Sequence, residues 1–105
     1  MASAHPLELY EWLDLNLTDR DKEWLAADPE RKIVVYVWHA VIECWIFTKG
    51  REEVLWVEDV YAYTFMPDPD EAMAQMESVV PEVCEGWTRL VSFYLEDVAL
   101  VNPYA

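Results

Sequence analysis

The segment from Glu43 to Phe65, ECWIFTKGREEVLWVEDVYAYTF, decides the fold that we predict for this chain. Both of its halves are dense in tryptophan, tyrosine and β-branched residues, which favour strands over helices. The residues TKGR between them supply a turn that contains glycine. Together with the preceding residues from Lys32, the segment predicts a long antiparallel β-hairpin. It also carries five acidic residues, an unusual load for a hairpin that should form the core.

Two short helices are predicted before the hairpin. Thr18 has the properties of a helix N-cap, with Asp21 three residues further on, and the helix that it begins should end near Pro29. The segment before Thr18 has apolar residues at helical spacing and acidic residues on another side. The expected apolar stripe of this first helix consists of Leu7, Tyr10, Leu13 and Leu17.

A third helix and a further strand are predicted after the hairpin. Asp68 can cap the helix, Pro69 suits its first position, and Pro81 is expected to end it. Residues 87–101 alternate between apolar and polar side chains, although a helix fits them almost as well. Their valine, phenylalanine and tyrosine content favours a strand.

The expected elements define a fold class. Their order, ααββαβ, predicts an α+β domain with a largely antiparallel sheet and its helices on one face. A chain of 105 residues can bury one core without a metal or a disulfide, so we expect a single acidic globular domain over residues 1–105.

The pairing of the hairpin follows if Lys49 and Gly50 form a two-residue turn, because Thr48 then faces Arg51. The core face would pair Val34 with Phe65, Tyr36 with Tyr63, Trp38 with Tyr61, Ala40 with Asp59, Ile42 with Val57 and Cys44 with Leu55. The opposite face would pair His39 with Val60, Val41 with Glu58, Glu43 with Trp56, Trp45 with Val54 and Phe47 with Glu52. A bulge of one residue near Gly50 or Glu58 would exchange these assignments.

The net charge limits the partners that the protein can have. Seven Lys and Arg stand against 21 Asp and Glu, which gives a net charge of −14. Such a field repels nucleic acids and anionic membranes and attracts basic proteins, although acidity can also serve solubility alone. Two separated cysteines and the lack of a long apolar segment predict a soluble, cytoplasmic protein.

The second face of the hairpin is the predicted partner-binding surface. Burying an unpaired carboxylate costs on the order of several kcal/mol, so these acids should reach water or a cationic partner. The tryptophans beside them suit an interface. Alternatively, the N-terminal helices or the C-terminal segment cover the tryptophans. The predicted partner-binding residues are Glu43, Trp45, Glu52, Glu53, Trp56, Glu58 and Asp59 on the hairpin, with Asp68, Asp70 and Glu71 at the start of the third helix.

Little in the sequence predicts catalysis. His39, Glu43 and Cys44 lie close together, but on a strand His39 and Glu43 are too far apart for a hydrogen bond. Two glycines are too few for a phosphate-binding loop or a nucleophile elbow, and neither histidine has partners at metal-ligand spacing. We therefore expect no enzyme activity, no cofactor and no metal ion.

These features predict a small acidic inhibitor that binds a basic, nucleic-acid-binding surface of a target protein. Its carboxylates would occupy the positions that phosphates use, as a nucleic-acid mimic does. Phage-encoded anti-defence proteins, such as anti-CRISPR and anti-restriction proteins, include small acidic domains of this sort, a comparison that rests on size and charge alone.

Two alternatives and one question stay open at this point. The protein could instead be an immunity protein that neutralises a basic toxin through the same surface. It could also be a small α+β domain with a ligand-binding or catalytic pocket, in which His39 and Glu43 are the polar groups. The sequence does not decide whether the protein forms a homodimer.

Overall fold

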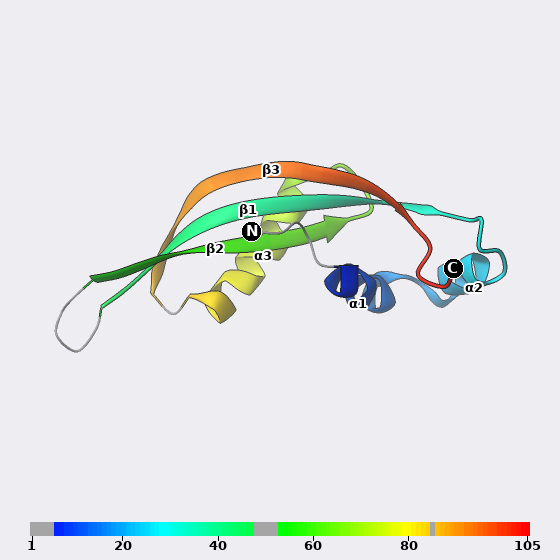
Figure 1. Cartoon of the computed structure of the whole chain (residues 1–105), viewed down its shortest axis with the longest axis horizontal. Helices are drawn as coiled ribbons and strands as arrows, with labels where there is room; N and C mark the ends of the chain where they lie inside the picture. The colour runs from blue at the N-terminus through cyan, green and yellow to red at the C-terminus, as the bar shows by residue number, and fades with distance from the viewer. Residues whose placement is uncertain (1–5, 48–52, 85) are drawn as a thin grey trace.

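The chain folds into three helices and one three-stranded sheet, in a computed structural model that describes residues 6–47, 53–84 and 86–105 (Figure 1). The elements are α1 (Pro6–Asn16), α2 (Asp19–Ala26), β1 (Ile33–Phe47), β2 (Glu53–Thr64), α3 (Pro69–Val83) and β3 (Trp87–Val101). The sheet has the order β2-β1-β3, and both pairings are antiparallel. The predicted α+β class, the order ααββαβ and the strand over residues 87–101 are therefore confirmed.

The central strand, β1, explains the long apolar run of the sequence. Val35, Val37, Trp38, Ala40 and Ile42 are all buried, so both faces of this strand are covered over much of its length. A strand that is covered on both faces is continuously apolar instead of alternating. The sheet around β1 gives the molecule its elongated shape, 59 × 22 × 22 Å.

The predicted register of the hairpin is wrong by one residue. Cys44 pairs with Trp56, Ala40 with Val60 and Trp38 with Ala62. Because side chains alternate along a strand, this shift exchanges the two faces of β2 while those of β1 stay as predicted. The predicted turn at Lys49 and Gly50 lies outside the described residues, but five residues separate the paired Phe47 and Glu53, so a two-residue turn does not fit this pairing.

The helices pack against two separate cores. α3 covers residues of β1 such as Trp38 and Ala40, together with Ala62 of β2. α1 and α2 instead cover Val35 and Val37, and successive strand residues point to opposite faces. The predicted placement of all helices on one face is therefore not confirmed.

Leucines attach α1 and α2 to the sheet. Leu9, Leu13, Leu17 and Leu25 are buried, whereas Tyr10, which was expected in the apolar stripe, is 44% exposed. Leu13 and Leu17 lie in the predicted stripe, and Leu9 replaces Tyr10 in it. Thr18 caps α2 as predicted, because its side chain accepts a hydrogen bond from the backbone N–H of Asp21.

The C-terminal segment fastens the end of α2. The side-chain amide of the buried Asn102 donates hydrogen bonds to the carbonyl oxygens of Leu25 (2.9 Å) and Asp28 (3.2 Å). Leu25 lies in the last turn of α2 and Asp28 just beyond it, where backbone carbonyls have no N–H partner within the helix. The residues after β3 therefore hold the N-terminal helices against the sheet.

The start of α3 is as predicted and its end is not. Asp68 caps the helix by accepting hydrogen bonds from the backbone N–H groups of Asp70 and Glu71, and Pro69 takes the first helical position. Pro81 lies inside the helix, which continues to Val83. A proline removes one hydrogen bond, but the N–H of Cys84 still bonds to the carbonyl of Val80 and closes the last turn.

Candidate functional site

The acidic residues of the hairpin do not form one open array. Glu43 lies on the sheet face opposite α3, and its Oε1 accepts a hydrogen bond from Arg89 Nε at 2.6 Å. This bond lowers the pKa of Glu43. Glu58 lies on the α3 side as a result of the register shift, and Glu52 and the side chain of Glu53 lie outside the described residues. The predicted open acidic array is therefore wrong for Glu58, and the charge of Glu43 is already neutralised by Arg89.

Replacing Arg89 with methionine should lower the melting temperature (Tm) slightly at neutral pH and not at all in acid. The folded-state pKa of Glu43 lies below its ordinary value of 4.5, so the stabilisation is present above that pH and is lost as the pH falls through the folded-state pKa. Thermal unfolding between pH 7 and pH 3 measures this difference. In the control Arg20→Met, on the exposed surface of α2, the difference in Tm should depend on pH less than in Arg89→Met, because Arg20 has no ion pair among the described residues. A gap between wild type and Arg89→Met that persists at low pH would contradict the assignment.

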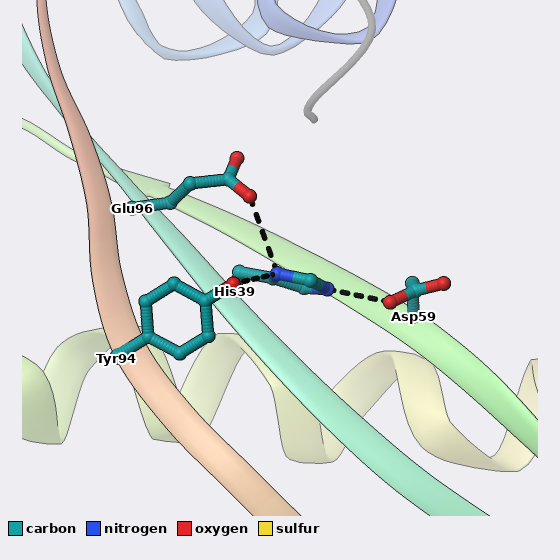
Figure 2. Close-up of polar contacts among 4 residues, drawn as sticks. All are labelled: His39, Asp59, Tyr94 and Glu96. Carbon is teal, nitrogen blue, oxygen red and sulfur yellow. Dashed lines mark hydrogen bonds and ion pairs between the residues drawn. The ribbon is translucent and has the colours of Figure 1, made fainter. Parts of the chain in front are cut away.

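His39 is the centre of a polar cluster that connects all three strands (Figure 2). Its Nε2 lies 2.6 Å from Oδ1 of Asp59 on β2. Its Nδ1 lies 2.7 Å from the hydroxyl of Tyr94 and 3.2 Å from Oε1 of Glu96, both on β3. The His39 ring also stacks on Tyr61, with centroids 4.6 Å apart. We call His39, Asp59, Tyr94 and Glu96 the His39 cluster.

A β-bulge helps to assemble this cluster. The β1–β3 register shifts between Val37 and Trp38, so Glu96 is the extra residue between Leu95 and Asp97. Bulges re-aim side chains in this way. As a result, Tyr94 and Glu96 both reach the same nitrogen of His39, although they lie on one strand.

The geometry allows two hydrogen-bonding patterns in the cluster. In the neutral tautomer, the Nε2–H of His39 donates to Asp59 and Nδ1 accepts the hydroxyl proton of Tyr94. When the ring is protonated, Nδ1–H can donate to Glu96 instead. In both patterns each ring nitrogen of His39 has a hydrogen-bond partner, and the residue is only 7% exposed. His39 therefore joins the strands and is not left free to act on a substrate.

The predicted tryptophans lie on opposite faces of the sheet. Trp56 is half-buried beside the core under α3, a consequence of the corrected register. Trp45 is on the same face as Glu43 and stacks on Trp87, with ring centroids 5.1 Å apart and planes at 2°. Its indole Nε1 is buried and has no acceptor in the part of the chain that the structure describes. Of the two tryptophans in the predicted partner-binding surface, only Trp45 therefore lies on the sheet face opposite α3.

The cysteines have no geometry for nucleophilic chemistry. Cys44 points to the face opposite His39 and lies in the core under α3, where it contacts Cys84. Burial raises the pKa of Cys44 to about 12, with a smaller contribution from the hydrogen bond to Cys84. Both thiols are free and buried. The grouping of His39, Glu43 and Cys44 in the sequence is therefore not a site in the fold.

Exposed acids gather on the helices. At α3, Asp68 serves as the cap, while Asp70 and Glu71 are exposed at the positive end of the helix dipole. A larger group lies on α1 and α2, where one ion pair, Lys22 with Asp14 at 3.3 Å, occurs among the described residues. We call this group the acidic helical surface; it consists of Glu8, Glu11, Asp14, Asp19, Asp21 and Glu23.

The sequence pattern contained the signal for this surface. Glu8, Glu11 and Asp14 recur at helical spacing on the side away from the buried leucines. The sequence prediction favours the hairpin acids instead, because their neighbours are aromatic. Exposed aromatic rings also accompany the acidic helical surface: Tyr10 and Trp24 are 44% and 47% exposed, and the guanidinium of Arg31 lies 5.0 Å from the centre of the Trp24 ring.

Comparisons with known proteins give no further assignment. No protein-family model matches the chain, and no curated protein or solved structure matches it. Within the described residues, no group of three or more histidine, cysteine or acidic side chains is arranged so that it could hold a metal ion, and no helix is both long and apolar enough to cross a membrane.

Proposed function

We propose that this protein is an acidic inhibitor that binds a basic protein surface, one that the target otherwise uses to hold nucleic acid. The observation that carries the proposal is the acidic helical surface, whose carboxylates are exposed and, apart from Asp14, have no ion-pair partner among the described residues. Carboxylates presented in this way can replace phosphates as partners of lysine and arginine. The partner-binding region therefore moves from the hairpin to α1 and α2.

The structural roles of the other acids support this choice. Glu43 and Asp59 are engaged with Arg89 and His39, and Asp68 holds the start of α3. Mutating them would therefore affect the fold together with any binding. Tyr10 and Trp24 add exposed aromatic area beside the free carboxylates, and aromatic residues often anchor interfaces.

We further propose a cytoplasmic location and no enzyme activity. Two free, buried cysteines in contact with each other suit a reducing compartment. The alternative of a pocket around His39 and Glu43 is less well supported, because both side chains already have charged partners within the sheet. An immunity protein would use the same acidic surface, and the identity of the captured partner distinguishes it.

Removing three carboxylates from the acidic helical surface should weaken partner binding at least about tenfold. The test variant is Glu11→Gln, Asp19→Asn and Glu23→Gln. The control, Asp70→Asn, Glu71→Gln and Glu77→Gln on α3, also removes three of the 14 net negative charges and likewise includes one aspartate in the first turn of a helix.

Affinity capture from a nuclease-treated bacterial lysate compares these variants with wild type. We expect wild type and the α3 control to retain a nucleic-acid-binding complex that elutes as salt rises, and the α1–α2 variant to lose it. Recovery of one small basic toxin would identify an immunity protein instead. Equal loss from both variants would show that net charge alone attracts the partner and would contradict the assigned surface.

A further inference from the structure

The strand β3 exposes a continuous apolar strip. Leu90, Leu95, Val98 and Leu100 are between 40% and 65% exposed. They pair with Ile42, Trp38, Tyr36 and Val34 of β1, so all four lie on the sheet face that carries α3. α3 packs over β1 and β2 on that face and leaves the β3 side open. We call these four residues the apolar strip; exposed apolar surface of this extent marks interaction sites.

The two edge strands of the sheet, β2 and β3, differ in whether side chains of the protein bond to their backbone. The side-chain amide of Gln75 on α3 accepts a hydrogen bond from the N–H of Tyr63 and donates one to its carbonyl, both at 2.9 Å, so the edge of β2 is covered at Tyr63. No side chain bonds to the backbone of β3 between Thr88 and Val101 in the portion of the chain described. A long open edge with apolar side chains is a template for pairing with another strand.

We propose that two copies of this chain associate through β3, as antiparallel neighbours related by a two-fold axis at Tyr94, which is the middle residue of the strand. In this register Leu90 faces Val98 of the second copy, and Phe93 faces Leu95. Each of these residues lies on the α3 side of its own sheet, so the two apolar strips merge into one. The sheet then becomes six-stranded, with the order β2-β1-β3-β3-β1-β2.

The bulges of β3 fit this register. Register shifts place two residues, 91 and 92, opposite Val41, and two more, 96 and 97, opposite Val37. With the axis at Tyr94, residues 91 and 92 of one copy face residues 97 and 96 of the other. Residues opposite each other therefore still point to the same face of the joined sheet on both sides of the bulges. A bulge that normally discourages edge pairing is here matched by another bulge.

Charge complementarity favours a second copy of this chain as the partner that pairs with β3. β3 carries only Arg89, Glu96 and Asp97, and Glu96 is turned toward His39. Arg89 and Asp97 pair with Glu43 and Val37, which lie on the same face of β1. The proposed register places Arg89 diagonally across from Asp97 of the second copy, within reach of a long side chain. Arg89, which also bonds to Glu43, thus gives Asp97 of the second copy a cation within reach, although each chain has a net charge of −14.

This self-association should respond to salt in the opposite sense to binding of a basic partner. Salt screens the repulsion between two acidic chains and leaves the apolar contact intact, so dimerisation should strengthen as salt rises. Binding of a basic surface should weaken. The inference is independent of the proposed function, and the sign of the salt effect separates the two.

Sedimentation equilibrium of the full chain at about 0.15 M and about 1 M NaCl tests the proposal. Val98→Lys should raise the dimer dissociation constant at least about tenfold, even though it reduces the repulsion between the chains. Val57→Lys is the matched control, because Val57 is 59% exposed on the other edge strand, and it should dimerise like wild type. Thermal unfolding confirms that both variants are folded.

A cross-linking experiment tests the register without relying on a destabilising change. In Leu90→Cys/Val98→Cys, oxidised glutathione should accept two electrons per bond and leave a disulfide between residue 90 of one copy and residue 98 of the other, giving a covalent dimer. Leu95→Cys/Val98→Cys has no opposed thiols and should stay monomeric on a denaturing gel. A wild-type protein that is monomeric at both salt concentrations, equal effects of the two lysine variants, or equal cross-linking of both cysteine pairs would overturn the proposal.

Discussion

Replacing Gly86 with alanine should destabilise the protein by about 3 kcal/mol or more. A Cβ atom at Gly86 would lie 1.6 Å from the carbonyl oxygen of Trp45 and 2.8 Å from Cγ2 of Ile46. The first neighbour is backbone in the central strand and cannot rotate away. The start of β3 would have to move away from β1, at the place where Trp87 stacks on Trp45.

Two measurements check this expectation. Chemical unfolding gives the loss of stability, and near-ultraviolet circular dichroism reports the stacked tryptophans, whose signal should weaken in Gly86→Ala. Thr88→Ala, an exposed position two residues further on, should change stability by less than about 0.5 kcal/mol. If Gly86→Ala were as stable as Thr88→Ala and kept the tryptophan signal, the close approach of the two strands would be wrong.

Replacing His39 with phenylalanine should cost about 2 to 4 kcal/mol of folding free energy. A phenyl ring can keep the stacking on Tyr61, but it gives no hydrogen bond to Asp59 and none to Tyr94 or Glu96. The carboxylate side chains of Asp59 and Glu96 are only 25% and 20% exposed, so water replaces the lost partner incompletely. All three strands lose a connection at once.

A milder variant separates charge from hydrogen bonding in the His39 cluster. Asp59→Asn keeps an oxygen that can accept from Nε2, so its cost should be nearer 1 kcal/mol. Urea unfolding of the two single variants and the double variant gives their coupling energy, which should be clearly above zero because the residues are in contact. Additive effects, or a His39→Phe variant within about 0.5 kcal/mol of wild type, would show that the cluster does not hold the strands together.

Local chemistry predicted most of the fold. The caps at Thr18 and Asp68 and the β-branched and aromatic composition of the hairpin and of residues 87–101 favour the elements that the structure contains. The register of β2 could not be predicted in this way, because both of its faces are apolar enough for a core. The number of residues in the connection decides the pairing, and a shift by one residue moves Trp56 and Glu58 to the other face.

The roles of the hairpin acids depend on contacts that are distant in sequence. Arg89 lies 46 residues from Glu43, and Tyr94 lies 55 residues from His39. These partners come from β3, and a bulge in that strand brings Glu96 into the cluster. No local pattern predicts either contact. Other acids, on α1, α2 and the start of α3, are exposed, and on α1 helical spacing alone predicts this exposure.

The exposed acids and the apolar strip of β3 lie in different parts of the molecule. α2 lies at one end of the long body, α1 lies between it and the middle, and β3 runs along one edge of the sheet (Figure 1). Among the described residues, exposed acids occur on α1, α2 and α3, whereas β3 carries three charged residues, Arg89, Glu96 and Asp97.

Competition with nucleic acid is the most direct test of the proposed inhibition. A fluorescently labelled oligonucleotide is bound to the captured target, and this protein is titrated into the complex while anisotropy is followed. We expect the oligonucleotide to be released, and the Glu11→Gln/Asp19→Asn/Glu23→Gln variant to need at least about ten times more protein for the same release. A ternary complex that keeps the oligonucleotide bound at saturating protein would show that the two ligands use different surfaces and would contradict the proposal.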